Sequence, residues 1–496
     1  MTAYSDLMAF QRDTQALAEI SGRLGWDQET IMPRGAAAQR GDELGAIEGV
    51  LHERRVDARV GDWLTAIDVS KLDQVGQAQI REIRRSYERN CKVSARLASE
   101  IARVTSKAQG EWAEARANED FAAFAPTLEK VVALRREEGQ ALAEGSEEGS
   151  AAYDALMADY EPGTSSSEIA ALFDALRPGL VELRDKIMGS SVTVAPLEGR
   201  FDTFRQMKLS QELALTFGYD LNRGRIDKAV HPFCSGSGAD VRITTRTALE
   251  DPFNCFYSTI HEVGHGCYEQ AVDPSYALTP IGRGASMGVH ESQSRIFENQ
   301  LARSRAFTGY LFERMSGEFG TLSVAGPEEF HAAVNRVYPG YIRTESDEVQ
   351  YNLHIMMRFD LERQLMDGSL AVADLPEAWN ARFLADFGVA VDKPSNGCLQ
   401  DVHWPVGLMG YFPTYTLGNV YAGCLEDAMR KDLPDLDADL ARGDLTAATG
   451  WLRQRVQVHG GLYEPRETIR RACGSEPSEK PLLAYLNRKF GDIYGF

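Results

Sequence analysis

Apolar side chains recur at intervals of three and four residues over most of the chain, which is the spacing of one buried face of a helix. Residues 72–117 contain two glycines and no proline, so they predict one or two long helices. The same pattern predicts further helices at 168–188, 202–217, 347–365, 376–387, 445–457 and 480–490. We therefore expect a mainly α fold.

One region departs from the helical pattern. Residues 219–246 are rich in glycine and β-branched side chains; Val241–Thr245 alternates like a short strand, and Cys234–Gly238 is typical of a turn. We expect a small β-sheet here, directly before a helix at about 252–270. Because no repeat or Pro/Gly/Ser-rich linker divides the chain, residues 1–496 are predicted to form a single helical domain, with a deep cleft between two lobes.

Composition narrows the classes of partner. The 73 acidic side chains outnumber the 53 basic ones, and the net charge of −20 argues against nucleic acid and anionic membranes as partners. No apolar run reaches the roughly 18–20 residues that span a bilayer, and the N-terminus lacks the pattern of a signal peptide. The seven cysteines include no C-x-x-C pair, which fits a reducing compartment. We expect a cytoplasmic protein.

Candidate chemistry lies on the helix that follows the sheet. Asp251 is a good N-cap, and Pro252 suits the first helical position. His261 and His265 are four residues apart, so their imidazoles lie on one helix face and can take two corners of a zinc tetrahedron. Glu262 projects about 100° further round, where it can reach a water activated by the ion but is badly placed as a ligand. Two buried histidines with purely structural roles are the alternative.

A catalytic zinc site needs a third protein ligand and one open position. After a turn-rich loop, a second helix is predicted at about 289–316, and it begins with His290 and Glu291. Glu291 lies 26 residues beyond His265, so an antiparallel return would bring it to the metal. Neighbouring residues on a helix project about 100° apart, so only one of His290 and Glu291 can face the ion. The spacing does not choose between them.

Several ordered blocks of the chain share a pattern. They are H-E-V-G-H at 261–265, H-E-S-Q-S-R at 290–295, L-G-W-D-Q-E-T at 24–30, H-P-F at 231–233, D-V-R-I-T at 240–244, I-R-T-E-S-D at 342–347 and G-C-L-Q-D-V-H-W at 397–404. Together these blocks resemble the carboxypeptidase Taq family, the M32 metallocarboxypeptidases. Ser346 replaces the alanine of the family block, which is a one-atom change.

The resemblance implies that Glu291, rather than His290, is the third metal ligand. It also implies a large helical fold of the zincin type with a deep substrate groove, a homodimer, and broad release of C-terminal residues from peptide substrates. One Zn²⁺ per chain is expected, with Co²⁺ as a candidate substitute.

A carboxypeptidase must also hold a free carboxylate, and the guanidinium fork of arginine does this best. Arg343 is the first candidate and Arg242 the second, both through the family blocks; the alternative for each is a structural arginine. The remaining candidates for substrate contact are His231, Gln400, Asp401, His403 and Tyr415. Tyr415 is preferred to Tyr411 as a donor to the oxyanion, with core packing as the alternative.

These residues predict a zinc metallocarboxypeptidase in which Glu262 accepts a proton from the attacking water. An endopeptidase or dipeptidase on the same scaffold is the nearest alternative. A non-catalytic peptide-binding protein is a second alternative, but it would be expected to lack a ligand or the base. The sequence retains all four groups, His261, Glu262, His265 and Glu291.

Overall fold

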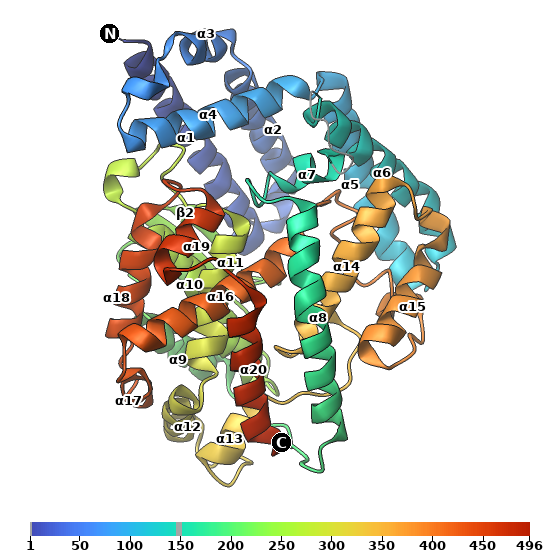
Figure 1. The fold of residues 1–496 in the computed structure, drawn as a ribbon, viewed down its shortest axis with the longest axis vertical. Coiled ribbons are helices and arrows are strands. Elements are labelled where there is room, and N and C mark those ends of the chain that lie inside the picture. The colour runs from blue at the N-terminus through green and yellow to red at the C-terminus, as the bar shows by residue number, and fades with distance from the viewer. Residues whose placement is uncertain (1, 145–150) are drawn as a thin grey trace. The chain divides into compact units, whose positions relative to one another are not determined.

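The chain folds into helices over most of its length (Figure 1). The computed structural model describes residues 2–144 and 151–496. Helices account for 69% of the residues and are accompanied by a three-stranded sheet, so the expected mainly α class is confirmed. Among the described residues, none of the helices combines the length and the apolar character of a membrane span.

Contacts between Cα atoms divide the chain into two compact units, each assembled from three separate stretches. The first unit comprises Met1–Cys91, Val194–Val334 and Tyr421–Pro477. The second comprises Lys92–Thr193, Asn335–Val420 and Ser478–Phe496. The single domain and the cleft expected from the sequence stay predictions.

The first unit carries the N-terminal helices, the sheet and the helices that flank it. Its helices are α1 (Ala3–Thr30), α2 (Ala37–Arg55), α3 (Ala58–Ala66), α4 (Gln74–Lys92), α9 (Thr203–Thr216), α10 (Pro252–Ala271), α11 (Met287–Arg295), α12 (Arg305–Phe319), α13 (Pro327–Val334), α17 (Leu436–Ala441), α18 (Thr446–Arg455) and α19 (Pro465–Cys473). In this unit α10 packs on the sheet and against both α9 and α11.

The second unit consists of long helices. They are α5 (Ala95–Ala117), α6 (Phe121–Leu142), α7 (Ala151–Met157), α8 (Ser166–Gly189), α14 (Gln350–Asp367), α15 (Leu375–Phe387) and α20 (Glu479–Tyr494). Helices α8 and α20 are far apart in sequence but lie side by side (Figure 1). Helix α16 (Pro413–Asp432) begins in this unit and ends in the first.

The sheet has the strand order β1-β3-β2. β3 (Asp240–Thr245) pairs in parallel with β1 (Ile226–Lys228) and antiparallel with β2 (Cys234–Ser237). The prediction of a turn at Cys234–Gly238 is therefore wrong for most of its length. Gly236 permits the close pairing of β2 with β3, because a Cβ at this position would lie 2.0 Å from the Asp240 carbonyl oxygen.

The helix predicted at about 289–316 is interrupted. Helix α11 ends at Arg295, a π-helical segment spans Ile296–Ala302, and α12 starts a new helix at Arg305. The hydroxyl of Ser304 caps α12 by accepting the backbone N–H of Phe307 at 3.1 Å. This local cap competes with a continuous helix, which is why the long periodic pattern is broken here.

Two glycines let α10 lie close to its neighbours. A Cβ at Gly264 would lie 2.5 Å from the Gln293 carbonyl oxygen of α11, and one at Gly266 would lie 2.8 Å from the Tyr219 ring. Asp251 caps the helix by accepting the N–H of Asn254 at 3.1 Å, as predicted. Helix α10 is therefore held close to α11, and both carry predicted site residues.

Candidate metal centre and active site

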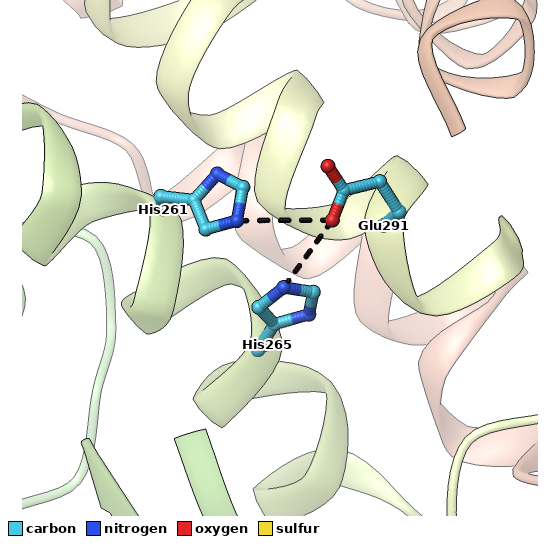
Figure 2. Close-up of side chains that lie close together, drawn as sticks. All are labelled: His261, His265 and Glu291. Atoms are coloured by element: carbon cyan, nitrogen blue, oxygen red, sulfur yellow. Dashed lines mark ion pairs between the residues drawn. The ribbon is translucent and has the colours of Figure 1, made fainter. Parts of the chain in front are cut away.

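Two helices of the first unit bring the predicted metal ligands together. His261 and His265 project from α10 toward the carboxylate of Glu291 on α11 (Figure 2). The Nε2 atoms of His261 and His265 lie 3.7 and 3.5 Å from Glu291 Oε2. The ligand atoms of the three residues all lie within 4.8 Å of one another.

The donor set fits a tetrahedral divalent ion. Two atoms that each lie about 2.0–2.1 Å from a tetrahedral zinc ion are about 3.3–3.4 Å apart. The observed separations of 3.5 and 3.7 Å are close to that value. Two imidazole nitrogens and one carboxylate oxygen are also a common ligand set of catalytic zinc. This group can therefore hold a metal ion with a position left for water.

Further side chains hold the three predicted ligands in place. Arg295 donates to Glu291 Oε1 at 2.6 Å, and this leaves Oε2 facing the two imidazoles. The Nδ1 atom of His261 lies 2.9 Å from Glu298 Oε2. His290 turns to the other side of His265, where the two Nδ1 atoms are 2.6 Å apart. His290 is thus placed beside a predicted ligand and not among the ligand atoms.

The charges of Glu291 and His265 suit metal binding. Burial alone would raise the pKa of Glu291, but Arg295 and His261 lower it well below its usual range. Burial lowers the pKa of His265 to about 4, against the opposing effect of Glu291. An ionised carboxylate and a neutral imidazole are the protonation states that metal ligands require.

Glu262 differs from the neighbouring carboxylates. It is 6% exposed, and burial raises its pKa to about 7, with His261 opposing and Glu291 adding to the rise. A carboxylate with a pKa near the working pH can both accept and return a proton.

A second cluster of predicted residues lies within the second unit. Arg343 donates from Nε and Nη2 to Asp401 Oδ1 at 3.0 and 2.8 Å. Arg358 contacts the other oxygen of Asp401 at 2.6 Å. One carboxylate is thus shared by two buried guanidinium groups, and the three groups together carry one positive charge.

The other candidates of the second unit surround this cluster. Gln400 accepts the backbone N–H of Arg343 at 3.1 Å. His403 Nε2 lies 3.3 Å from the Tyr415 hydroxyl, and Tyr415 lies beneath the Arg343 guanidinium at 5.3 Å from the ring centroid. Burial, followed by Arg343, lowers the pKa of His403 to about 4, so the ring is neutral at pH 7.

The two remaining candidates belong to the first unit. Arg242 on β3 donates to both oxygens of Asp240 at 2.8 and 2.9 Å and lies over the Trp26 ring at 4.4 Å. These contacts give Arg242 a structural role in the sheet. His231 is exposed in the segment before β2.

Comparison with known proteins decides the family. A family model described as carboxypeptidase Taq (M32) metallopeptidase matches residues 6–490. The chain belongs to this family. The M32 resemblance seen in the sequence is therefore confirmed over nearly the whole chain. As an M32 protein, the chain is a hydrolase of peptide bonds in a metal-dependent family.

M32 relatives match along nearly their full length. Thermostable carboxypeptidase 1 of Thermus thermophilus is 41% identical, with 99% of each chain covered. Carboxypeptidase 1 of Bacillus subtilis is 31% identical, with 96% of each chain covered. The crystal structure of an M32 carboxypeptidase from Deinococcus radiodurans R1 superposes with a TM-score of 0.94 at 36% identity, and the match covers 100% of both chains.

Some residues of this candidate site were not anticipated from the sequence. Glu298 contacts His261, and Glu269 contacts His290 at 2.8 Å. The signal for Glu269 was its position four residues after His265, on the same helix face. Glu298 lies in the π-helical segment, where ordinary helical spacing does not predict which face a residue occupies.

Proposed function

We propose that this M32 protein is a zinc metallocarboxypeptidase that removes C-terminal residues from peptides with broad specificity. The observation that carries the proposal is the group of His261, His265 and Glu291, whose donor atoms face one another at distances suited to a tetrahedral ion. Co²⁺ is a candidate substitute, because it accepts the same nitrogen and oxygen ligands.

The residues of the first unit would divide the chemistry among them. When bound, zinc supplies a Lewis acid that acidifies water and polarises the peptide carbonyl. Glu262, which follows His261 on α10 and is buried, accepts a proton from the attacking water and passes it to the leaving amine. Arg295 and Glu298 hold Glu291 and His261 in position during the reaction.

Recognition of the free carboxylate is assigned to Arg343. Its support is the net positive charge of Arg343, Arg358 and Asp401, because a buried positive charge favours an anion. The residues proposed to orient the substrate around Arg343 are Gln400, Asp401, His403 and Tyr415. Arg242 and His231 remain secondary candidates for substrate contact.

The proposal is tested by pairing metal analysis with peptide digestion. The wild type is expected to bind one zinc ion per chain, and Glu291→Ala to bind much less. Peptides with blocked N-termini should be shortened one residue at a time from the C-terminus. Internal cleavage of C-terminally amidated peptides would instead support the endopeptidase alternative, and hydrolysis that survives chelation would remove the metal from the mechanism.

We also propose a cytoplasmic homodimer. The cytoplasmic location is supported by the seven cysteines, none of which forms a disulfide bond in the part of the chain that the structure describes. The homodimer rests on the family resemblance alone. Light scattering should give a mass close to twice the 54.9 kDa of one chain, and a mass near one chain would contradict the dimer.

A further inference from the structure

The two predicted histidine ligands are supported in different ways. His261 contacts a carboxylate directly, through Nδ1 and Glu298 Oε2 at 2.9 Å. His265 has another histidine in that position, because its Nδ1 lies 2.6 Å from Nδ1 of His290. His290 in turn contacts Glu269 Oε1 through Nε2 at 2.8 Å. The carboxylate of Glu269 therefore supports His265 only indirectly, through the imidazole of His290.

We propose that His290 and Glu269 form a positioning relay that sets the tautomer and the ring orientation of His265, and through them the affinity for zinc. The proposal rests on the proposed metal site, since it concerns how one of its ligands is held. Outer-shell partners of this kind typically change metal affinity by about 10–100-fold when they are removed.

The hydrogen bonds fix where each proton lies. A ligand nitrogen must offer a lone pair, so the proton of neutral His265 belongs on Nδ1, from which it is donated to His290 Nδ1. His290 then carries its own proton on Nε2 and donates it to Glu269 Oε1. The opposite arrangement would leave His290 Nε2 and Glu269 Oε1 as two acceptors facing each other. The carboxylate thus selects the tautomer in which His265 can bind a metal.

The surrounding loop holds His290 closely. A Cβ at Gly284 would lie 2.5 Å from His290 Cδ2 and 3.0 Å from the Tyr268 ring, so this position accepts only glycine without a shift. The Gly284 N–H also donates to Glu269 Oε1 at 2.9 Å. Glu269 is 6% exposed, which shields the relay from competing water. The geometry is therefore that of a preformed support.

Two substitutions at one position separate the relay from a packing role. In His290→Asn a carbonyl oxygen can still accept from His265, whereas His290→Phe keeps the ring but has no acceptor. Zinc affinity of the metal-free enzyme, measured by competition with a chelator, is expected to fall by about 10–100-fold in the Phe variant and less in the Asn variant. A Phe variant that binds zinc as tightly as the Asn variant, or more tightly, would overturn the relay.

A double-variant cycle tests whether His290 and Glu269 act in series. Glu269→Gln removes the charge and is expected to weaken zinc binding by itself. Adding it to His290→Phe should cause no further loss, because the relay is already cut; additive losses would contradict the proposal. Glu269→Gln also keeps the proposal testable if the Phe variant does not fold.

A control histidine separates general destabilisation from the relay. His331 is buried in the first unit and contacts the Thr308 hydroxyl at 3.0 Å. His331→Gln is expected to lower the melting temperature without changing zinc affinity. If the wild type itself binds no zinc, the proposed function fails. If it binds zinc tightly and His290→Phe and Glu269→Gln bind it equally well, only the relay fails.

Discussion

At the scale of single residues, Glu262 carries the sharpest prediction. Glu262→Gln keeps the shape of the side chain but cannot accept a proton, so kcat is expected to fall by about 10²–10⁴-fold. Zinc content should stay at the wild-type value, because the three predicted ligands are unchanged. Steady-state kinetics and metal analysis on the same preparation provide the measurement. A variant that retains turnover would remove Glu262 from the mechanism.

The sequence predicted the residues whose relation is local. His261 and His265 share a helix face at fixed spacing, so their geometry followed from the helix alone. The spacing did not show whether His290 or Glu291 is the third metal ligand. The family resemblance implied that it is Glu291. Glu298 could not be predicted, because its contact with His261 depends on how α11 and the π-helical segment pack against α10.

At the scale of elements, the close contact between α10 and α11 depends on Gly264. In Gly264→Ala the new Cβ would lie 2.5 Å from the Gln293 carbonyl oxygen, which is backbone and can move only with α11. We expect a loss of about 1–3 kcal/mol in the free energy of unfolding, together with weaker zinc binding.

Gly309→Ala on α12 is the matched control, because a Cβ there meets nothing within 4 Å. Chemical denaturation should show Gly309→Ala to be stabilised by about 0.5–1 kcal/mol. Equal stability of the two variants would contradict the close contact.

A second element-scale feature is the anchor between α14 and the segment that follows Asp401. Glu362 on α14 accepts the Trp404 indole N–H at 3.0 Å and also accepts the Gly410 backbone N–H. It is fully buried, and burial raises its pKa to about 7, although these two donors, Tyr153 and Arg135 oppose the rise. The folded state therefore holds the proton of Glu362 at a pH where the unfolded chain has lost it.

This difference fixes the sign of a pH effect on stability. With a pKa raised from 4.5 to about 7, Glu362 weakens folding as the pH rises, by about 3 kcal/mol between pH 4 and pH 8. Glu362→Gln has no such titration but loses an acceptor. Its deficit in melting temperature relative to the wild type should thus be large near pH 5 and small near pH 8. A deficit that grows with pH would contradict the assignment.

Element boundaries show where periodicity stops being informative. The helices at 168–188 and 202–217 were predicted to within two residues of α8 and α9, because each is a continuous amphipathic pattern. The expected turn at Cys234–Gly238 was mostly strand β2, because glycines there permit close pairing with β3. A local pattern cannot separate these two uses of glycine.

At the scale of the whole molecule, the division into two units could not be predicted from the sequence. Each unit is built from three stretches, so its boundaries follow contacts between distant segments and no linker marks them. The predicted metal ligands all belong to the first unit, and Arg343 with its neighbours belongs to the second. Zinc binding should therefore act first on the stability of the first unit.

Hydrogen exchange with and without zinc tests this assignment. A ligand that binds only the folded site stabilises it by RT ln(1 + [Zn]/Kd), about 2.7 kcal/mol at a hundredfold excess over Kd. That free energy opposes every opening that separates α10 from α11, so chelation should speed amide exchange in these two helices by about 100-fold. Helices α8 and α20 of the second unit are the internal control and should exchange at unchanged rates. If α8 and α20 lose protection to the same extent, zinc stabilises the whole molecule against global unfolding. The local effect proposed for the first unit is then wrong.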